Sequence, residues 1–275
     1  MLEVIRIIIL GVIQGITEWL PISSTGHLLL VEEFMNLQVS DEFLEMFRVV
    51  IQLGSIMAVV VLYFHRLNPF SPKKTSKQKM ITFQLWIKVA VATIPAAVIG
   101  FLFDDWIDEH FFNPYVVAIM LIFYGVIFIV VENWRKDMPP KFSNISQLTI
   151  PIVLSIGFFQ VLALIPGTSR SGATIIGALI LGVARVAAAE FTFFLAIPVM
   201  FGASLLKVLN FGFDFTGTEI FLLTLGTLVA FVVSIFVLKF LIAYVKKNDF
   251  KIFGYYRIVL GTLILLYFGI GFMLA

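Results

Sequence analysis

Six apolar stretches, each long enough to cross a lipid bilayer as a helix, constrain the fold of this chain more than any other feature. A transmembrane helix needs about 20 predominantly apolar residues. Only 13% of the 275 residues are charged, whereas about a quarter are charged in a typical soluble domain. The sequence therefore predicts an all-α polytopic membrane protein with six transmembrane helices, at residues 43–64, 85–103, 114–134, 188–209, 219–245 and 255–274.

Two further apolar stretches, residues 2–36 and 148–184, are each interrupted midway by Pro, Gly, Ser and Thr. Broken helices at membrane depth are tolerated only where protein or a wet cavity satisfies the freed backbone groups. We therefore expect two re-entrant helical hairpins, each of which enters and leaves the membrane on the same side.

The charges of the loops alternate along the chain and predict its orientation. The segments 65–79, 135–141 and 246–251 are basic, whereas 104–110 and 210–219 are acidic. By the positive-inside rule, the basic loops are cytoplasmic and the acidic loops face outward. Because the six spans connect these loops, the signs alternate without conflict, and the first hairpin is expected to open outward and the second inward.

The two hairpins resemble each other when the sequence is shifted by about 146 residues, as expected for a repeat. "GVIQGITEWLPISSTG" (11–26) then aligns with "GFFQVLALIPGTSRSG" (157–172), which pairs Gln14 with Gln160 and Ser23 with Ser169. Opposite hairpin orientations with similar sequences are typical of an inverted-topology repeat. The chain is thus expected to form a single membrane domain, 1–275, with a first repeat at 1–140 (hairpin 2–36, spans 43–64, 85–103 and 114–134) and a second at 147–275 (hairpin 148–184, spans 188–209, 219–245 and 255–274).

Hydroxyl side chains follow each break, where a new half-helix would begin. The N-terminus of a helix presents free N–H groups and a positive dipole end, which suits an anion. Arg170 would add a guanidinium, which binds phosphate in a bidentate manner. The alternative is that the hydroxyls only cap the helices and that Arg170 extends to the interface. The residues expected to surround the anion are Ser23, Thr25, Gly26, Thr168, Ser169, Ser171 and Gly172.

Glu18 follows Gln14 by four positions, so both side chains lie on one helix face. A carboxylate beside an anion pocket is explained if a divalent cation, Mg²⁺ or Ca²⁺, bridges the two, because both cations favour oxygen ligands. Glu18 and Gln14 are then the candidate metal ligands. An ion pair between Glu18 and Arg170 explains the carboxylate equally well, and the sequence leaves both interpretations open.

His27 follows Ser24 by three positions, which can bring an imidazole and a hydroxyl together on one helix. This is the pairing that activates a weak nucleophile through a general base. Ser24, His27, Glu18 and Arg170 are therefore the candidate catalytic residues. A water molecule activated by His27 is an alternative nucleophile.

These elements resemble the undecaprenyl-pyrophosphate phosphatases of bacteria, also called bacitracin-resistance proteins. The resemblance covers nearly the whole chain and rests on "QGITE", "PISSTGH" and "PGTSRSG", supported by "VVIQLGSIMAVVV" and "AAEFTFFLAIPVMFGAS". It implies hydrolysis of undecaprenyl pyrophosphate to undecaprenyl phosphate at the outer face of the plasma membrane, which recycles the lipid carrier of peptidoglycan synthesis. It also implies catalytic roles for Glu18, Ser24, His27 and Arg170. Many members have Glu where this chain has Gln14, which leaves Glu18 as the stronger metal ligand.

The expected partners are the polyprenyl pyrophosphate substrate and membrane lipids, with a homodimer as an open alternative. The basic residues lie in membrane-flanking loops, so nucleic-acid binding is not expected. The main competing function is that of a lipid-phosphate flippase or anion transporter, because inverted repeats with broken helices are also a transporter architecture.

Overall fold

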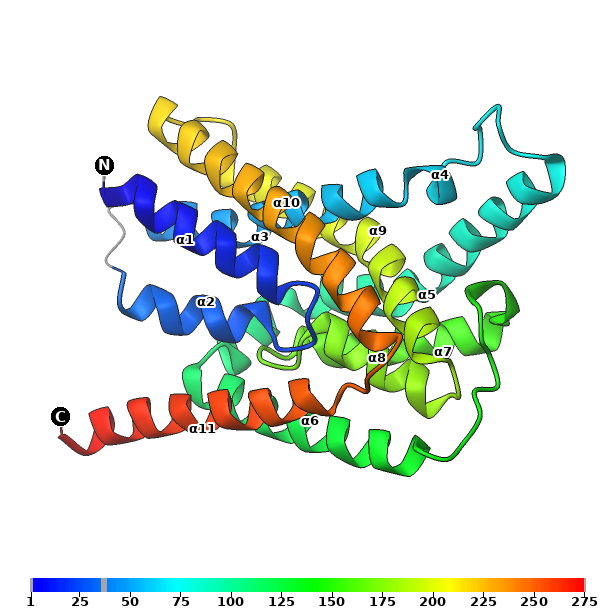
Figure 1. Ribbon diagram of the computed structural model, residues 1–275. Helices are drawn as coiled ribbons and strands as arrows, with labels where there is room; N and C mark the ends of the chain where they lie inside the picture. Colours follow the sequence, from blue (N-terminus) through cyan, green and yellow to red (C-terminus); the bar gives the residue numbers. More distant parts are fainter. Residues whose placement is uncertain (1, 36–38, 275) are drawn as a thin grey trace.

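The computed structural model describes residues 2–35 and 39–274, with the side chains of 104–105 and 270–274 excepted. Within these residues the chain is helical, and its only β-type pairing is an isolated bridge between Phe142 and Val183. The elements, coloured along the chain in Figure 1, are α1 (Leu2–Thr17), α2 (Ser24–Glu33), α3 (Asp41–Leu62), α4 (Phe64–Leu67), α5 (Ser76–Phe111), α6 (Pro114–Arg135), η1 (Ile145–Gln147), α7 (Ile150–Val161), η2 (Leu162–Leu164), α8 (Arg170–Ile180), α9 (Arg185–Phe211), α10 (Gly217–Val245) and α11 (Lys251–Leu274).

Six of the described helices are long and apolar enough to cross a membrane, which confirms the six predicted spans. They are Asp41–Leu62, Ser76–Phe103, Pro114–Arg135, Arg185–Phe211, Gly217–Val245 and Lys251–Gly269. Lipid-facing side chains need no polar partners, and large apolar residues such as Phe101, Phe123 and Phe236 are accordingly exposed on the surface of the molecule. The chain is therefore a multi-pass membrane protein.

The predicted loops on both sides of the span 85–103 are wrong in part. The acidic segment 104–110 is not a loop, because α5 continues through it to Phe111. Acidic side chains are compatible with a helix, and the turn to α6 needs only Phe112 and Asn113, whose side chain caps α6. The basic segment 65–79 is also partly helical, because it contains most of α4 and the first turn of α5, which is held by a capping box of Thr75 and Gln78.

Both interrupted apolar stretches form pairs of short helices, as the breaks predict. Helices α1 and α2 are joined by residues 18–23, and α7 with η2 is joined to α8 by residues 165–169. The last residue of the predicted hairpin 2–36 lies outside the described residues. In Figure 1 the two connecting loops approach each other near the middle of the molecule, whereas the chain termini lie at the left and the linkers 68–75 and 136–149 at the right.

The first helix of each pair packs against a long helix from the other half of the chain. Helix α1 packs on α10, and α7 packs on α5. Gly11 and Gly15 permit the first contact, because a Cβ at either position would lie within 2.9 Å of a backbone oxygen of α10. Gly157 has the same function between α7 and α5, where a Cβ would lie 2.4 Å from the carbonyl oxygen of Ala92.

The apolar core surrounds the two connecting loops. Trp19, in the first loop, is fully buried and meets Phe193 of α9 edge to face, with ring centroids 5.2 Å apart. Phe191 and Phe194 of α9 are also fully buried beside it. Close packing of large side chains limits how far the loops can shift. The polar groups in the loops are therefore held in fixed positions.

Candidate active site

The short helices α2 and α8 begin with serine caps that share an unusual backbone conformation. Ser23 and Ser169 both have φ 71°, a region that non-glycine residues rarely adopt and that costs about 1–3 kcal/mol. The Ser23 hydroxyl accepts a hydrogen bond from the N–H of Gly26 over 3.4 Å, and that of Ser169 accepts one from the N–H of Gly172 over 3.1 Å. The two connecting loops are therefore built alike.

These caps determine which backbone groups remain available for an anion. The N–H groups of Gly26 and Gly172 already donate to the cap hydroxyls. The earlier N–H groups in the first turns of α2 and α8 have no acceptor within their own helices. A positive helix end with free N–H groups stabilises an anion. Of the predicted anion-binding residues, the two glycines thus contribute to capping, whereas Ser24, Thr25 and Ser171 carry the uncapped N–H groups.

Glu18 and Arg170 join the two connecting loops through a buried ion pair. Arg170 Nη2 donates to Glu18 Oε1 over 2.8 Å, and the side chains are 12% and 5% exposed. Arg170 Nη1 donates to the carbonyl oxygen of Thr192 over 2.9 Å, and the guanidinium lies 5.6 Å from the ring centroid of Trp19. Of the two interpretations of Glu18, the structure contains the ion pair.

The second oxygen of Glu18 receives two further hydrogen bonds. Gln14 Nε2 donates to Oε2 over 2.9 Å, and the hydroxyl of Ser24 donates to the same atom over 3.3 Å. Two buried polar atoms beside this cluster, Gln14 Oε1 and Arg170 Nε, have no partner among the described residues. A buried polar atom without a partner costs free energy. A bound group that offers both an acceptor and a positive charge would satisfy both atoms.

The structure does not contain the expected hydrogen bond between Ser24 and His27. His27 Nδ1 lies 2.7 Å from the carbonyl oxygen of Ser23, four residues earlier in the chain. Because a carbonyl oxygen only accepts, Nδ1 carries the proton and Nε2 of the neutral ring is an acceptor. The Ser24 hydroxyl donates to Glu18 instead.

Tyr256 of α11 is a site residue that the sequence patterns did not indicate. Its hydroxyl lies 2.7 Å from His27 Nε2, and the two rings stack at 5° with centroids 5.5 Å apart. The hydroxyl therefore donates to Nε2 and fixes the orientation of the imidazole.

Arg257, the next residue of α11, holds the two connecting loops together. Its side chain is fully buried. It donates to the carbonyl oxygens of Pro21 over 3.1 Å, Gly167 over 2.8 Å and Thr168 over 2.9 Å. Among the described residues it forms no ion pair, and backbone carbonyls together with the ring of Tyr124, whose centroid lies 5.8 Å from the guanidinium, compensate its charge. A charge inside an otherwise apolar span is a functional signal in sequence, and this signal could have identified Arg257.

The remaining predicted residues lie around this cluster with different contacts. Ser171 Oγ lies 3.5 Å from the carbonyl oxygens of Glu18 and Leu20 and 3.1 Å from Ser169 Oγ, so it links the loops. Thr168 is fully buried, and its hydroxyl has no partner among the described residues. Thr25 is half-buried.

Taken together, the fold and the site define a class: a polytopic helical membrane protein with a buried polar cluster, in which hydrogen bonds join a serine, a carboxylate and a guanidinium group. Comparison with known proteins gives the family. The sequence model of the family described as Bacitracin resistance protein BacA matches residues 7–263, and the chain belongs to this family.

Similar proteins cover nearly all of the chain. An undecaprenyl-diphosphatase of Acetivibrio thermocellus is 63% identical over 268 residues, which are 98% of each chain. An undecaprenyl-diphosphatase of Enterococcus faecalis is 60% identical over 267 residues, which are 96% of this chain and 97% of the relative. Undecaprenyl-diphosphatase 1 of Clostridioides difficile is 59% identical over 268 residues, which are 98% of this chain and 97% of the relative.

Proposed function

We infer that this chain is an undecaprenyl-diphosphatase, which hydrolyses undecaprenyl pyrophosphate to undecaprenyl phosphate and inorganic phosphate. Family membership and relatives of this name over the full length support the activity. The observation that carries the mechanism is the chain of contacts from Arg170 through Glu18 to the Ser24 hydroxyl. It joins an anion-binding group, a carboxylate and a nucleophile in one buried cluster.

We propose that the two halves of the chain form an inverted-topology repeat with two re-entrant hairpins. The equal φ angles of Ser23 and Ser169 support this proposal. So does the reciprocal packing of α1 on α10 and of α7 on α5. Arg257 donates to Pro21 and Gly167, which are equivalent under the shift of about 146 residues. A site between two broken helices is typical of such repeats.

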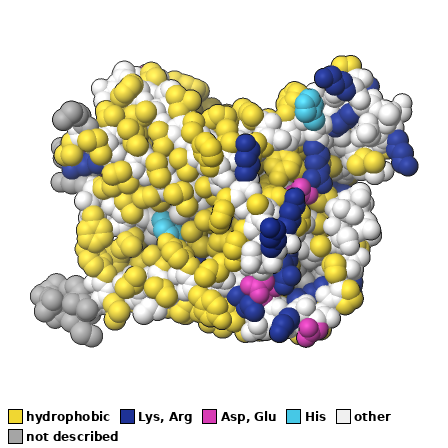
Figure 2. Space-filling model, viewed as in Figure 1, with side chains coloured by type: hydrophobic (Ala, Val, Ile, Leu, Met, Phe, Trp, Pro, Cys, Tyr) yellow, Lys and Arg dark blue, Asp and Glu magenta, His cyan; other side chains and the backbone are white. Residues whose placement is uncertain are grey.

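We propose that the site faces the outer side of the plasma membrane. The basic linkers gather at one end of the molecule, and Figure 2 shows Lys and Arg concentrated on the right of a surface that is mainly hydrophobic on the left. By the positive-inside rule this end is cytoplasmic. The first hairpin, which carries Glu18, Ser24 and His27, begins at the opposite end (Figure 1).

In the mechanism that we propose for hydrolysis, the pyrophosphate binds between the first turns of α2 and α8. Their uncapped N–H groups and the unpartnered Nε of Arg170 donate to phosphoryl oxygens. The buried charge of Arg257 adds positive potential from beneath both loops. Phosphoryl transfer is catalysed mainly by positioning and by charge stabilisation, and these groups supply both.

Ser24 Oγ then attacks the terminal phosphorus, and its proton moves to Glu18 Oε2, which already accepts a hydrogen bond from this hydroxyl. A bond forms between Ser24 Oγ and phosphorus, the bridging P–O bond breaks, and undecaprenyl phosphate leaves. Water releases inorganic phosphate from the phosphoserine. His27 Nε2 accepts a proton from this water once the water has displaced the Tyr256 hydroxyl, which donates to that nitrogen in the structure. The alternative is direct attack on the terminal phosphorus by a water molecule that His27 activates.

A divalent cation, Mg²⁺ or Ca²⁺, fits beside Glu18. Gln14 Oε1 is a buried oxygen without a partner, and Glu18 is the adjacent carboxylate. The described residues contain no group of three or more His, Cys, Asp or Glu that could hold a metal alone. Mg²⁺ is commonly bound by one or two carboxylates together with substrate phosphates, so Glu18 and Gln14 would hold it jointly with the pyrophosphate. The cation would neutralise charge on the leaving phosphate.

The test is phosphate release from undecaprenyl pyrophosphate by the purified full-length protein in detergent, where no gradient exists. Wild-type protein is expected to release phosphate, and Arg170→Ala is expected to release almost none. Equal rates for the two proteins would contradict the assigned site. Absence of release from the wild type, together with movement of the lipid between leaflets in vesicles, would favour a flippase, which the broken-helix architecture also suits.

A further inference from the structure

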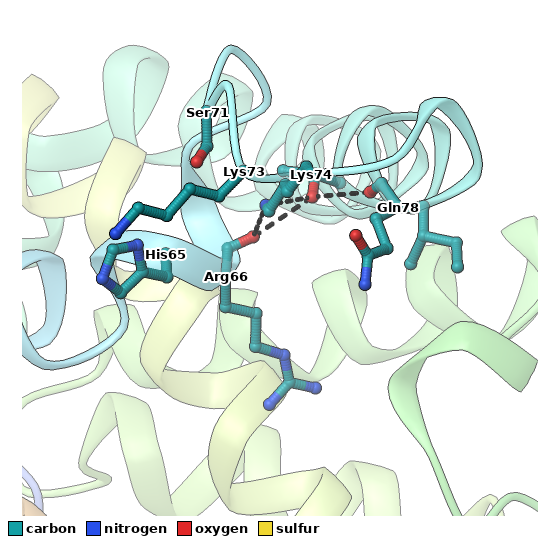
Figure 3. A pocket seen from close by; sticks show the side chains of 8 residues that line it. His65, Arg66, Ser71, Lys73, Lys74 and Gln78 are labelled. Carbon is teal, nitrogen blue, oxygen red and sulfur yellow. Dashed lines mark hydrogen bonds between the residues drawn. The ribbon is translucent and has the colours of Figure 1, made fainter.

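A cation-rich hollow that does not include Glu18 or Arg170 lies at the linker between the first two long helices. It has a volume of about 460 Å³ and is lined by α4, by the linker that follows it and by the first two turns of α5. Figure 3 shows its principal side chains, and Figure 2 shows Lys and Arg gathered at this end of the molecule. The proposed phosphatase mechanism does not use it.

The walls of the hollow are fixed by hydrogen bonds. Lys74 Nζ donates to the carbonyl oxygen of Arg66 over 3.1 Å and to Thr82 Oγ1 over 2.7 Å (Figure 3). Trp86 Nε1 donates to the carbonyl oxygen of Leu67 over 2.8 Å and joins α4 to α5. The hollow is therefore preformed and does not need a ligand to assemble it.

Of the cationic side chains that line the hollow, only Arg66 has an acidic partner among the described residues. The one described acid that pairs here is Glu190, which lies 2.7 Å from Arg66 and directs that guanidinium away from Lys74 (Figure 3). Neither Lys73 nor His65 has an ion pair among the described residues. Partial removal from water lowers the pKa of Lys74, and an anion in the hollow would offset this cost. The local charge thus favours a bound anion.

Exposed aromatic residues directly precede two residues that line the hollow, Phe64 before His65 and Phe70 before Ser71, and these two phenylalanines are called the rim. Phe64 is 51% exposed and Phe70 is 77% exposed, and Phe70 meets Phe83 edge to face. This rim adjoins the start of the second apolar span, at Ser76. Aromatic side chains beside lysines at the end of a span are typical of the headgroup region of a bilayer. A soluble anion would leave the rim in water, whereas a lipid would cover it.

We propose that this hollow binds the phosphate headgroup of an anionic phospholipid from the leaflet that it faces. Lys73 and His65 contact the phosphate, Lys74 contributes from the opposite wall, and the acyl chains lie against Phe64 and Phe70. By the loop charges this leaflet is the cytoplasmic one, where anionic lipids attract basic segments by about 1 kcal/mol per Lys or Arg.

The test uses purified full-length protein, titrated with phosphatidylglycerol or phosphatidylcholine and examined by native mass spectrometry. The probe variant is Lys73→Gln, with His65→Gln as a second probe. The matched control is Lys77→Gln, which removes the same charge from an exposed position of α5 that does not line the hollow. Inorganic phosphate is added as a competitor in a separate arm.

We expect Lys73→Gln to weaken phosphatidylglycerol binding about fivefold, the equivalent of one lysine contact, with phosphatidylcholine unchanged and Lys77→Gln near the wild type. Equal weakening by Lys73→Gln and Lys77→Gln would overturn the proposal, because it would indicate diffuse attraction only. Binding of inorganic phosphate that requires Lys73, without preference for the anionic lipid, would overturn the lipid assignment. Phosphatase activity, measured on the same samples, should be unchanged in Lys73→Gln.

Discussion

Glu18 and Arg170, 152 positions apart in the chain, form a buried ion pair of 2.8 Å that joins the two connecting loops at the centre of the molecule. The pair neutralises both charges while no substrate is bound. A pyrophosphate would compete with Glu18 for the guanidinium, and the carboxylate would then be free to take a proton or a cation. Breaking this ion pair is thus a step of the proposed reaction, and the intact pair links the two loops.

Substitution of Arg170 tests this relationship. Arg170→Lys keeps the charge but loses the planar fork that binds phosphate in a bidentate manner, whereas Arg170→Gln loses both. We expect kcat/KM for phosphate release to fall about 10²–10³-fold in Arg170→Gln, the range for loss of one preorganised charge-stabilising donor, and by less in Arg170→Lys. Equal losses in the two variants would show that the charge alone contributes nothing.

Substitutions of the two serines at the start of α2 should distinguish a catalytic role from a capping role. Ser24→Ala removes the proposed nucleophile, and we expect it to abolish turnover and phosphoserine formation, as detected by mass spectrometry after reaction with a slow substrate. A Ser24→Ala protein with near-normal turnover would exclude Ser24 as the nucleophile and favour water activated by His27.

Ser23 provides the contrasting substitution. Ser23→Ala loses the cap and keeps a Cβ at φ 71°, whereas Ser23→Gly loses the cap but suits the positive φ. Loss of a cap costs about 1 kcal/mol, so Ser23→Ala should unfold at a lower temperature than the wild type, whereas relief of the positive φ offsets the lost cap in Ser23→Gly and makes it the more stable variant. The same order is expected for the alanine and glycine variants of Ser169. Greater stability of the alanine variants would contradict the positive φ at these caps.

Tyr256 should influence catalysis through His27. Tyr256→Phe removes the hydroxyl that bonds Nε2 but retains the stacked ring. One hydrogen bond is worth about 1 kcal/mol, so we expect kcat to fall about fivefold with little change in KM. The neighbouring Tyr255 is exposed and forms no hydrogen bond among the described residues, so Tyr255→Phe is the matched control. A purely structural role for Tyr256 would lower thermal stability without this selective effect on kcat.

The spans and the breaks could be predicted from the sequence, because hydrophobic length and the Pro, Gly and Ser interruptions are local properties. "QGITEWLPISSTGH" and "PGTSRSG" also carry most of the cluster that the structure brings together. Helical spacing placed Gln14 beside Glu18 correctly, since both lie near the end of one regular helix. The same argument failed for Ser24 and His27, because the carbonyl oxygen of Ser23 competes for the imidazole.

The contributions of α11 could not be derived from motifs. Tyr256 and Arg257 reach the site only through the packing of α11 on α6, which no local pattern determines. Arg257 can nevertheless be recognised in the sequence, because a charged residue in an apolar span is costly and usually functional. The continuation of α5 through its acidic end cannot be predicted from charge, because a run of acidic residues suits a loop and a helix equally.

The last prediction concerns the cation. If Glu18 and Gln14 hold a divalent ion together with the pyrophosphate, a chelator should abolish activity, and Mg²⁺ or Ca²⁺ should restore it. Gln14→Glu adds a second carboxylate and should lower the cation concentration needed for half-maximal activity, because hard cations prefer charged oxygen ligands. Gln14→Ala, which removes the unpartnered Oε1, should raise that concentration. Activity that is insensitive to the chelator in all three proteins would exclude the metal and leave Glu18 with the roles of proton acceptor and partner of Arg170.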